Sequence, residues 1–236
     1  MSLNYAEAML TDSPAPVLEG DDPLPIQIAD YIRHQIIHDI LKPGEPIRER
    51  TIAEQLNVSR TPMRDALKIL SVERLVELIP NRGAVVVQNS IDDLSDMLTV
   101  YAELEAMGGV AACRMATEGD FLRVERHLAL MAAAADEGDR LKYFRANQAF
   151  HLSIIAASRN KTLIEIHANL SLRLYRVRYL AIMAQEIWQA RSAAHEELVQ
   201  TLRARDTARM AELQKAHFQV AWRLIDDWSR PQQSRR

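Results

Sequence analysis

Apolar residues recur at helical spacing along most of the chain, and two short stretches between residues 49 and 70 show the pattern most clearly. Asn57-Val58-Ser59 separates the stretches, so they predict two helices joined by a tight turn. Ser59 is a suitable N-cap for the second helix, and Pro62 falls in its first turn, where a missing N–H breaks no helical hydrogen bond. The pattern is typical of a helix-turn-helix. Its apolar positions are Ile52, Ala53 and Leu56, then Ala66, Leu67 and Leu70.

The segments on either side extend this motif into a larger predicted domain. Downstream, residues 75–79 and 84–87 have the composition of strands, and Pro80-Asn81-Arg82-Gly83 is a turn between them, so they predict a β-hairpin wing. Upstream, Pro43-Gly44 ends one long predicted helix. Its apolar face is formed by Ile26, Ile28, Ala29, Ile32, Ile36, Ile37 and Ile40. We therefore predict a winged helix-turn-helix domain at residues 23–90.

The start of the second short helix contains basic and polar residues of the kind that contact DNA. Arg60, Thr61 and Arg64 fall where a recognition helix normally meets base edges in the major groove. Arg82, at the tip of the predicted wing, can reach a phosphate or the minor groove. The alternative is an ordinary helical hairpin with solvated arginines. Because the turn, the cap and the basic N-terminus agree, we favour DNA binding.

Composition changes this picture little. The 236 residues carry 29 Lys and Arg against 32 Asp and Glu, so the net charge of −3 does not itself indicate nucleic-acid binding. The single cysteine, Cys113, permits no internal disulfide, and we expect a core residue in a reducing compartment. No stretch reaches the roughly 18 apolar residues of a membrane span, and the N-terminus lacks a secretory signal pattern. We expect a cytoplasmic protein that does not contact membranes.

Helical patterns without strand signals continue from residue 91. Helices this long cannot bury their apolar faces alone, so we predict an antiparallel bundle of about six at residues 91–230 and a mainly α fold overall. Gly108-Gly109 lies inside the first of them, where close helix–helix approach is favoured over a kink. Residues 1–22, acidic at their end, and residues 231–236 are predicted tails. The expected helices are 92–117, 120–136, 139–158, 161–184, 186–204 and 206–229.

Five short motifs resemble the GntR family of bacterial transcription regulators. They are Lys42-Pro43-Gly44, Arg48-Glu49-Arg50, Val58-Ser59-Arg60-Thr61-Pro62, Arg64-Asp65-Ala66-Leu67 and Pro80-Asn81-Arg82-Gly83. The resemblance implies DNA contacts by Arg50, Arg60, Arg64, Asn81, Arg82 and Gly83. Ser59 and Thr61, beside the arginines of the second helix, complete the predicted DNA-binding set.

The C-terminal half resembles the ligand-sensing helical domain, or FCD domain, of the FadR subgroup within that family. Leu104-Glu105, Asn147-Gln148-Ala149-Phe150-His151, His195 and His217 carry the resemblance. It implies a divalent metal held by Asn147, His151, His195 and His217, where many relatives have Asp in place of Asn147. An amide oxygen can coordinate a metal but adds no charge. Zinc and nickel suit imidazole best, and manganese is a third candidate. The other histidines are interpreted as structural or exposed: His34, His38, His127 and His167.

The same resemblance implies an effector pocket. Many relatives carry an acid-binding arginine four residues before Glu105, but this chain has Tyr101 there. Arg173 and Arg178 flank an apolar stripe at residues 163–177, so one of them can reach the pocket, although surface pairing is the expected role of both. The candidate pocket is Tyr101, Glu105, Arg173 and Arg178. With Tyr101 in place of the arginine, the alternatives are a less charged ligand or an acid held by the metal alone, and a carboxylate is the expected class of effector.

Together these features predict a transcription regulator, most often a repressor in this class, and not an enzyme. A homodimer joined by its helical half, through the helix containing Gly108 and Gly109, is expected to bind a pseudo-palindromic operator. One alternative is a metal-dependent hydrolase with Glu196 as general base, although no His-Glu-x-x-His, nucleophile elbow or phosphate loop is present. The other is a constitutive DNA-binding protein with a structural metal.

Overall fold

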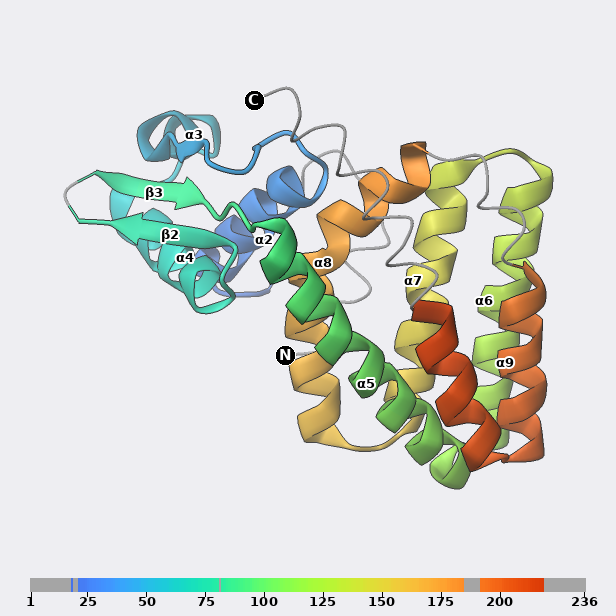
Figure 1. Ribbon diagram of the computed structural model, residues 1–236. Coiled ribbons are helices and arrows are strands. Elements are labelled where there is room, and N and C mark those ends of the chain that lie inside the picture. Colours follow the sequence, from blue (N-terminus) through green and yellow to red (C-terminus); the bar gives the residue numbers. More distant parts are fainter. Residues whose placement is uncertain (1–17, 19–20, 81, 185–191, 219–236) are drawn as a thin grey trace. The chain divides into compact units, whose positions relative to one another are not determined.

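The chain divides between Ser90 and Ile91 into two units. The computed structural model describes residues 18, 21–80, 82–184 and 192–218, and the two units are shown in Figure 1. The predicted tail at residues 231–236 and most of the tail at residues 1–22 lie outside the described residues. Among the described residues, no helix combines the length and the apolar character that a membrane span requires.

Three helices form the scaffold of the N-terminal unit: α2 (Leu24–Ile37), α3 (Glu49–Gln55) and α4 (Arg60–Val72). Helices α2 and α4 pack together through the predicted apolar faces, and Ile28, Ile32 and Leu70 are fully buried. The predicted extension of the first helix to Ile40 is wrong. Asp39 takes a positive φ of 61°, which ends the helix, and the Ile40 side chain is 58% exposed.

The wing is confirmed as part of a small antiparallel sheet. Strands β2 (Val76–Ile79) and β3 (Gly83–Val86) form the hairpin, with Ile79 opposite Gly83. Gly83 has a φ of +87°, a conformation that glycine adopts without strain. A two-residue strand, β1 (Pro46–Ile47), pairs with the other side of β3 and gives the order β1-β3-β2. This third strand was not predicted because two residues carry no alternating pattern.

The C-terminal unit is helical throughout its described part. Its six helical segments there follow the predicted bundle, and the mainly α fold class is confirmed (Figure 1). Parts of the last two predicted helices lie outside the described residues. The segments are α5 (Ile91–Met115), α6 (Glu118–Asp136), α7 (Arg140–Ala157), α8 (Lys161–Ala184), α9 (Ser192–Ala204) and residues 207–218.

Helix α5 approaches its neighbours most closely at its two glycines. A Cβ atom at Gly108 would overlap Cδ1 of Ile155 on α7, and one at Gly109 would lie 2.8 Å from Cγ of Met210. The predicted close approach is therefore confirmed. Both glycines are buried inside the bundle of one chain, so their predicted place at a dimer surface is wrong.

The far end of α5 is tied to the start of the last helical segment. Arg205 donates hydrogen bonds of 2.8 Å to the carbonyl oxygens of Cys113 and Ala116. Cys113 is buried, as predicted. Burial, reinforced by the nearby Asp206 carboxylate, raises the pKa of the Cys113 thiol to about 11, so the thiol stays protonated at neutral pH. These contacts fix the last helical segment against α5.

Candidate functional site

The N-terminus of α4 presents the predicted recognition residues to solvent. Arg60, Thr61 and Arg64 are exposed, while Met63 and Leu67 on the opposite face of the helix are buried. The apolar stripe therefore sets which way the polar residues face. Ser59 is the N-cap and has extended backbone angles, but its hydroxyl makes no capping hydrogen bond. The Ser59 side chain is exposed beside the two arginines.

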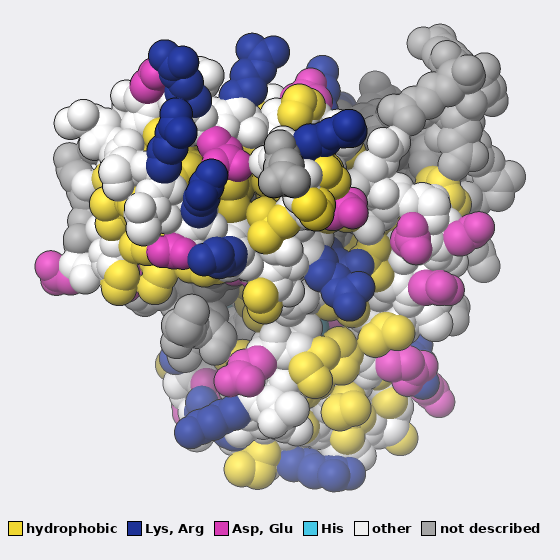
Figure 2. All heavy atoms as spheres, turned by 90° about the vertical axis from the view of Figure 1, so that its left-hand side faces the viewer, with side chains coloured by type: hydrophobic (Ala, Val, Ile, Leu, Met, Phe, Trp, Pro, Cys, Tyr) yellow, Lys and Arg dark blue, Asp and Glu magenta, His cyan; other side chains and the backbone are white. Residues whose placement is uncertain are grey.

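The remaining predicted DNA-binding residues come from α3 and the wing. The Arg50 side chain is 82% exposed and forms an ion pair of 2.8 Å with Glu54. Arg82 is exposed in the hairpin turn, and Gly83 begins β3. Asn81 lies outside the described residues. Figure 2 shows Lys and Arg side chains gathered over the winged-helix unit, although the chain as a whole carries a net charge of −3.

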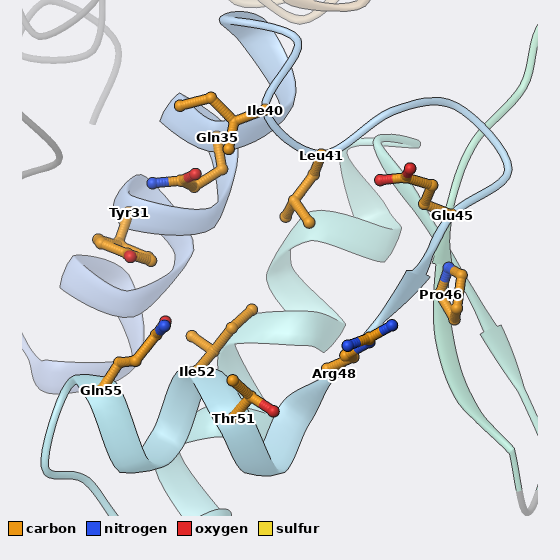
Figure 3. Close-up of a pocket in the computed structure, with 10 residues that line it drawn as sticks. All are labelled: Tyr31, Gln35, Ile40, Leu41, Glu45, Pro46, Arg48, Thr51, Ile52 and Gln55. Carbon is orange, nitrogen blue, oxygen red and sulfur yellow. The ribbon is translucent and has the colours of Figure 1, made fainter.

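A cavity of about 450 Å³ lies in the same unit, between α2, α3 and the loop that joins them. Tyr31 and Gln35 line it from α2, and Ile52 and Gln55 line it from α3 (Figure 3). Ile40 also lines this cavity. It lies in the loop after α2, because α2 ends at Ile37. The lining shares no residue with the predicted DNA-binding set.

Three histidines meet inside the helical unit. His151 on α7, His195 on α9 and His217 on the last helical segment each offer one ring nitrogen, and these nitrogens lie within 4.8 Å of one another. The ring centroids of His195 and His217 are 4.6 Å apart, and His151 and His195 are buried. Asn147, also buried, precedes His151 by one helical turn. This donor set is chemically suited to a divalent metal.

A buried carboxylate lies next to this cluster. Glu105 on α5 is fully buried, and its Oε2 atom lies 3.6 Å from Nδ1 of His151. Its Oε1 atom lies 2.8 Å from Nε2 of His167 on α8, and His167 is also fully buried. The Tyr101 ring stacks on His167 with centroids 4.7 Å apart. His167 was interpreted from the sequence as structural or exposed; it is a buried structural residue, but its contact with Glu105 was not predicted.

The charge states within this group follow from burial and proximity. Burial raises the pKa of Glu105, but a protonated imidazole at His151 or His167 outweighs that effect and holds the pKa well below its ordinary range. Burial lowers the pKa of His151, with Glu105 opposing the shift. The lowered pKa of His151 favours its neutral imidazole. A neutral imidazole is the form that binds a metal.

Arg178 on α8 faces Tyr101 rather than solvent. Its Nη1 atom donates a 3.0 Å hydrogen bond to the Tyr101 hydroxyl, and only 8% of the residue is exposed. The surface pairing expected for Arg178 is therefore wrong. Within the described part of the chain, no carboxylate forms an ion pair with its guanidinium. Arg173, on the same helix, is half-buried.

Comparisons with known families and proteins agree with the two-domain architecture. The gntR family of bacterial regulatory proteins matches residues 26–86, and the FCD domain matches residues 96–220. The HTH-type transcriptional repressor GlaR of Escherichia coli (strain K12) is 26% identical over 198 residues, covering 80% of this chain and 89% of GlaR. The Nta operon transcriptional regulator of Aminobacter aminovorans is 30% identical over 156 residues, covering 66% of this chain and 71% of that protein.

A solved structure shares the fold. E. coli McbR/YncC superimposes with a TM-score of 0.77 at 23% identity, covering 88% of this chain and 99% of that one. A winged helix-turn-helix followed by an FCD domain defines a class of DNA-binding transcription regulators rather than enzymes. The chain belongs to the GntR family, in the group that carries an FCD domain. These comparisons lend no support to the hydrolase alternative.

Proposed function

We propose that this protein is a GntR regulator of the FadR type whose operator binding is controlled by a divalent metal and a small carboxylate effector in the helical domain. The observation that carries the proposal is the meeting of His151, His195 and His217, which come from three different helical segments. Such convergence is not needed for packing, because the bundle has its own apolar core.

The chemistry of the cluster favours zinc or nickel, with manganese as the third candidate. Imidazole nitrogen is a preferred ligand of Zn²⁺ and Ni²⁺, and Asn147 offers an amide oxygen one turn from His151. Burial keeps His151 in the neutral form that a metal requires. Around an ion that takes more than four ligands, three imidazoles and one amide leave coordination positions for an effector.

Removing one imidazole tests the metal site. His195→Ala should reduce bound Zn²⁺ from about one ion per chain to nearly none, because the two remaining imidazoles cannot hold a metal tightly. Zinc content after gel filtration and isothermal titration measure this, and circular dichroism checks the fold. His127→Ala, a half-buried histidine on α6 outside the cluster, is the matched control and should bind like wild type. Unchanged binding by His195→Ala would contradict the site.

The effector proposal rests on Arg178. A buried guanidinium whose observed hydrogen-bond partner is the neutral hydroxyl of Tyr101 is suited to receive an anion. Tyr101 replaces the arginine that the family resemblance leads us to expect, and Arg178 brings a cation to this tyrosine from α8. A small carboxylate that binds Arg178, and the metal through an open position, therefore fits the polar groups of this region.

Replacing each of the two arginines of α8 separately by glutamine tests this assignment. A panel of two- to six-carbon carboxylates is screened for an effect on operator affinity of the wild-type protein. Arg178→Gln should lower the affinity of the protein for the active carboxylate about 10–100-fold. This is the loss expected when a hydrogen bond to a charged group, worth about 1.5–3 kcal/mol, disappears. Arg173→Gln is the control and should respond like wild type. A larger loss of carboxylate affinity in Arg173→Gln than in Arg178→Gln would contradict the assignment and give the acid-binding role to Arg173.

For DNA, we propose that α4 enters the major groove while Arg82 of the wing contacts the backbone or minor groove. One winged helix covers too little DNA for high specificity, so we propose a homodimer on a pseudo-palindromic operator. Val100 and Met107 on α5 and Ile166 on α8 are about half exposed and offer apolar side chains for such a contact. The relative GlaR is a transcriptional repressor, so we propose repression here as well.

Substituting the recognition arginine tests the DNA contacts. Arg64→Ala should lose about 1–3 kcal/mol of binding at an operator selected from random DNA, because a bidentate contact to a guanine edge disappears. Fluorescence anisotropy against operator and scrambled DNA at one salt concentration measures the loss, and the titration should show two chains per operator. Arg82→Ala should weaken both DNAs evenly. Arg126→Ala, an exposed arginine of the helical unit, is the control. Wild-type affinity in Arg64→Ala would exclude α4 as the recognition helix.

A further inference from the structure

The proposed metal ligands lack negative charge. Asn147 contributes a neutral amide, and the three histidines bind metal as neutral imidazoles. A divalent ion held by them would keep its full charge in a buried site, which is unfavourable without a nearby anion. Glu105 is the carboxylate that the described structure places against this cluster, 3.6 Å from His151. It does not belong to the ligand set, so its role needs a separate explanation.

We propose that Glu105, held in place by His167, is the positioning residue of the metal site and supplies the negative charge that Asn147 does not. This inference rests on the proposed metal binding. In this proposal Glu105 orients the metal ligand His151, and His167 holds Glu105 in place.

The geometry at His151 determines which ring nitrogen is available. Oε2 of Glu105 lies beside Nδ1 of His151, so the carboxylate favours the tautomer with a proton on Nδ1 and a lone pair on Nε2. Metal-binding histidines commonly direct their second nitrogen at a carboxylate in this way. The separation of 3.6 Å is longer than a normal hydrogen bond. A cation on Nε2 makes Nδ1–H a stronger donor, so we expect this distance to shorten when metal binds.

His167 explains why the carboxylate remains in this position. Its Nε2 atom is 2.8 Å from Oε1 of Glu105, and the ring is packed against Tyr101. The backbone of α5 is also constrained, because Gly108, three residues after Glu105, contacts Ile155 and Leu163 without space for a side chain. The carboxylate is therefore held between an imidazole on α8 and the imidazole of His151 on α7.

Removing the charge at constant size tests the proposal. Glu105→Gln should weaken Zn²⁺ binding about 10–100-fold in a calorimetric titration of the full-length protein, the usual effect of losing such a supporting group. His167→Gln should weaken it less, because the carboxylate remains but is less well held. Asp120→Asn is the matched control: Asp120 is also a buried carboxylate of the helical unit, paired with Arg159. That variant should bind Zn²⁺ like wild type.

A rescue experiment separates charge from packing. If Glu105 compensates for Asn147, then Asn147→Asp should recover most of the affinity lost in Glu105→Gln, and it should tighten binding less in the wild-type background. A purely structural role for Glu105 predicts no such rescue. Nitrogen-15 spectra of the Zn²⁺-loaded wild type should also show the proton of His151 on Nδ1.

The outcomes distinguish this inference from the proposed metal site. A wild-type protein that binds none of Zn²⁺, Ni²⁺ and Mn²⁺ contradicts both. A wild type that binds Zn²⁺ while Glu105→Gln binds equally well overturns the role of Glu105 and leaves the site intact. If Glu105→Gln does not fold, His167→Gln decides the question: wild-type affinity and an Nε2 proton on His151 would overturn the proposal.

Discussion

The close packing of α5 against its neighbours is the constraint on which the helical unit depends. Gly108 and Gly109 leave no space for side chains between α5, Ile155 on α7 and Met210 on the last helical segment. One and two turns earlier, the same helix places Glu105 against His151 and His167, and Tyr101 against Arg178 and Phe218. The close approach of the α5 backbone at its glycines thus helps to position the polar side chains earlier on the same helix.

In both units, the packing of apolar residues determines the direction in which the polar side chains point. In α4, burial of Met63 and Leu67 turns Arg60 and Arg64 outward, so a chain with a net charge of −3 still presents cations at the proposed DNA-binding surface. In the helical unit, apolar packing turns His151 and Glu105 inward, where burial and mutual attraction determine which group is charged. In both units, apolar packing therefore orients the side chains of the proposed sites.

Most of the fold was predictable because it follows local periodicity. The helix-turn-helix, the wing and the helical bundle appear as predicted, and the glycine pair in α5 marks a close approach. Apart from the early end of α2 at Asp39 and the short strand β1, the errors concern contacts between segments distant in sequence. The pattern at His167 indicates burial, but it does not reveal that Glu105, 62 residues away, would face it. Likewise, nothing local to Arg178 reveals that it meets Tyr101, 77 residues away. The histidines came from the family resemblance, because three lone histidines on different helices form no local motif.

The central claim is that the histidine cluster in the helical domain controls DNA binding by the other domain. Operator affinity measured by anisotropy on one preparation, first stripped of metal and then supplied with one equivalent of Zn²⁺, tests it most directly. The account predicts a change of about 5–150-fold, the usual range for coupling between two sites, and no change in His195→Ala. Equal affinities of a wild-type protein that nevertheless binds one Zn²⁺ per chain would contradict it, and would identify a constitutive DNA-binding protein with a structural metal.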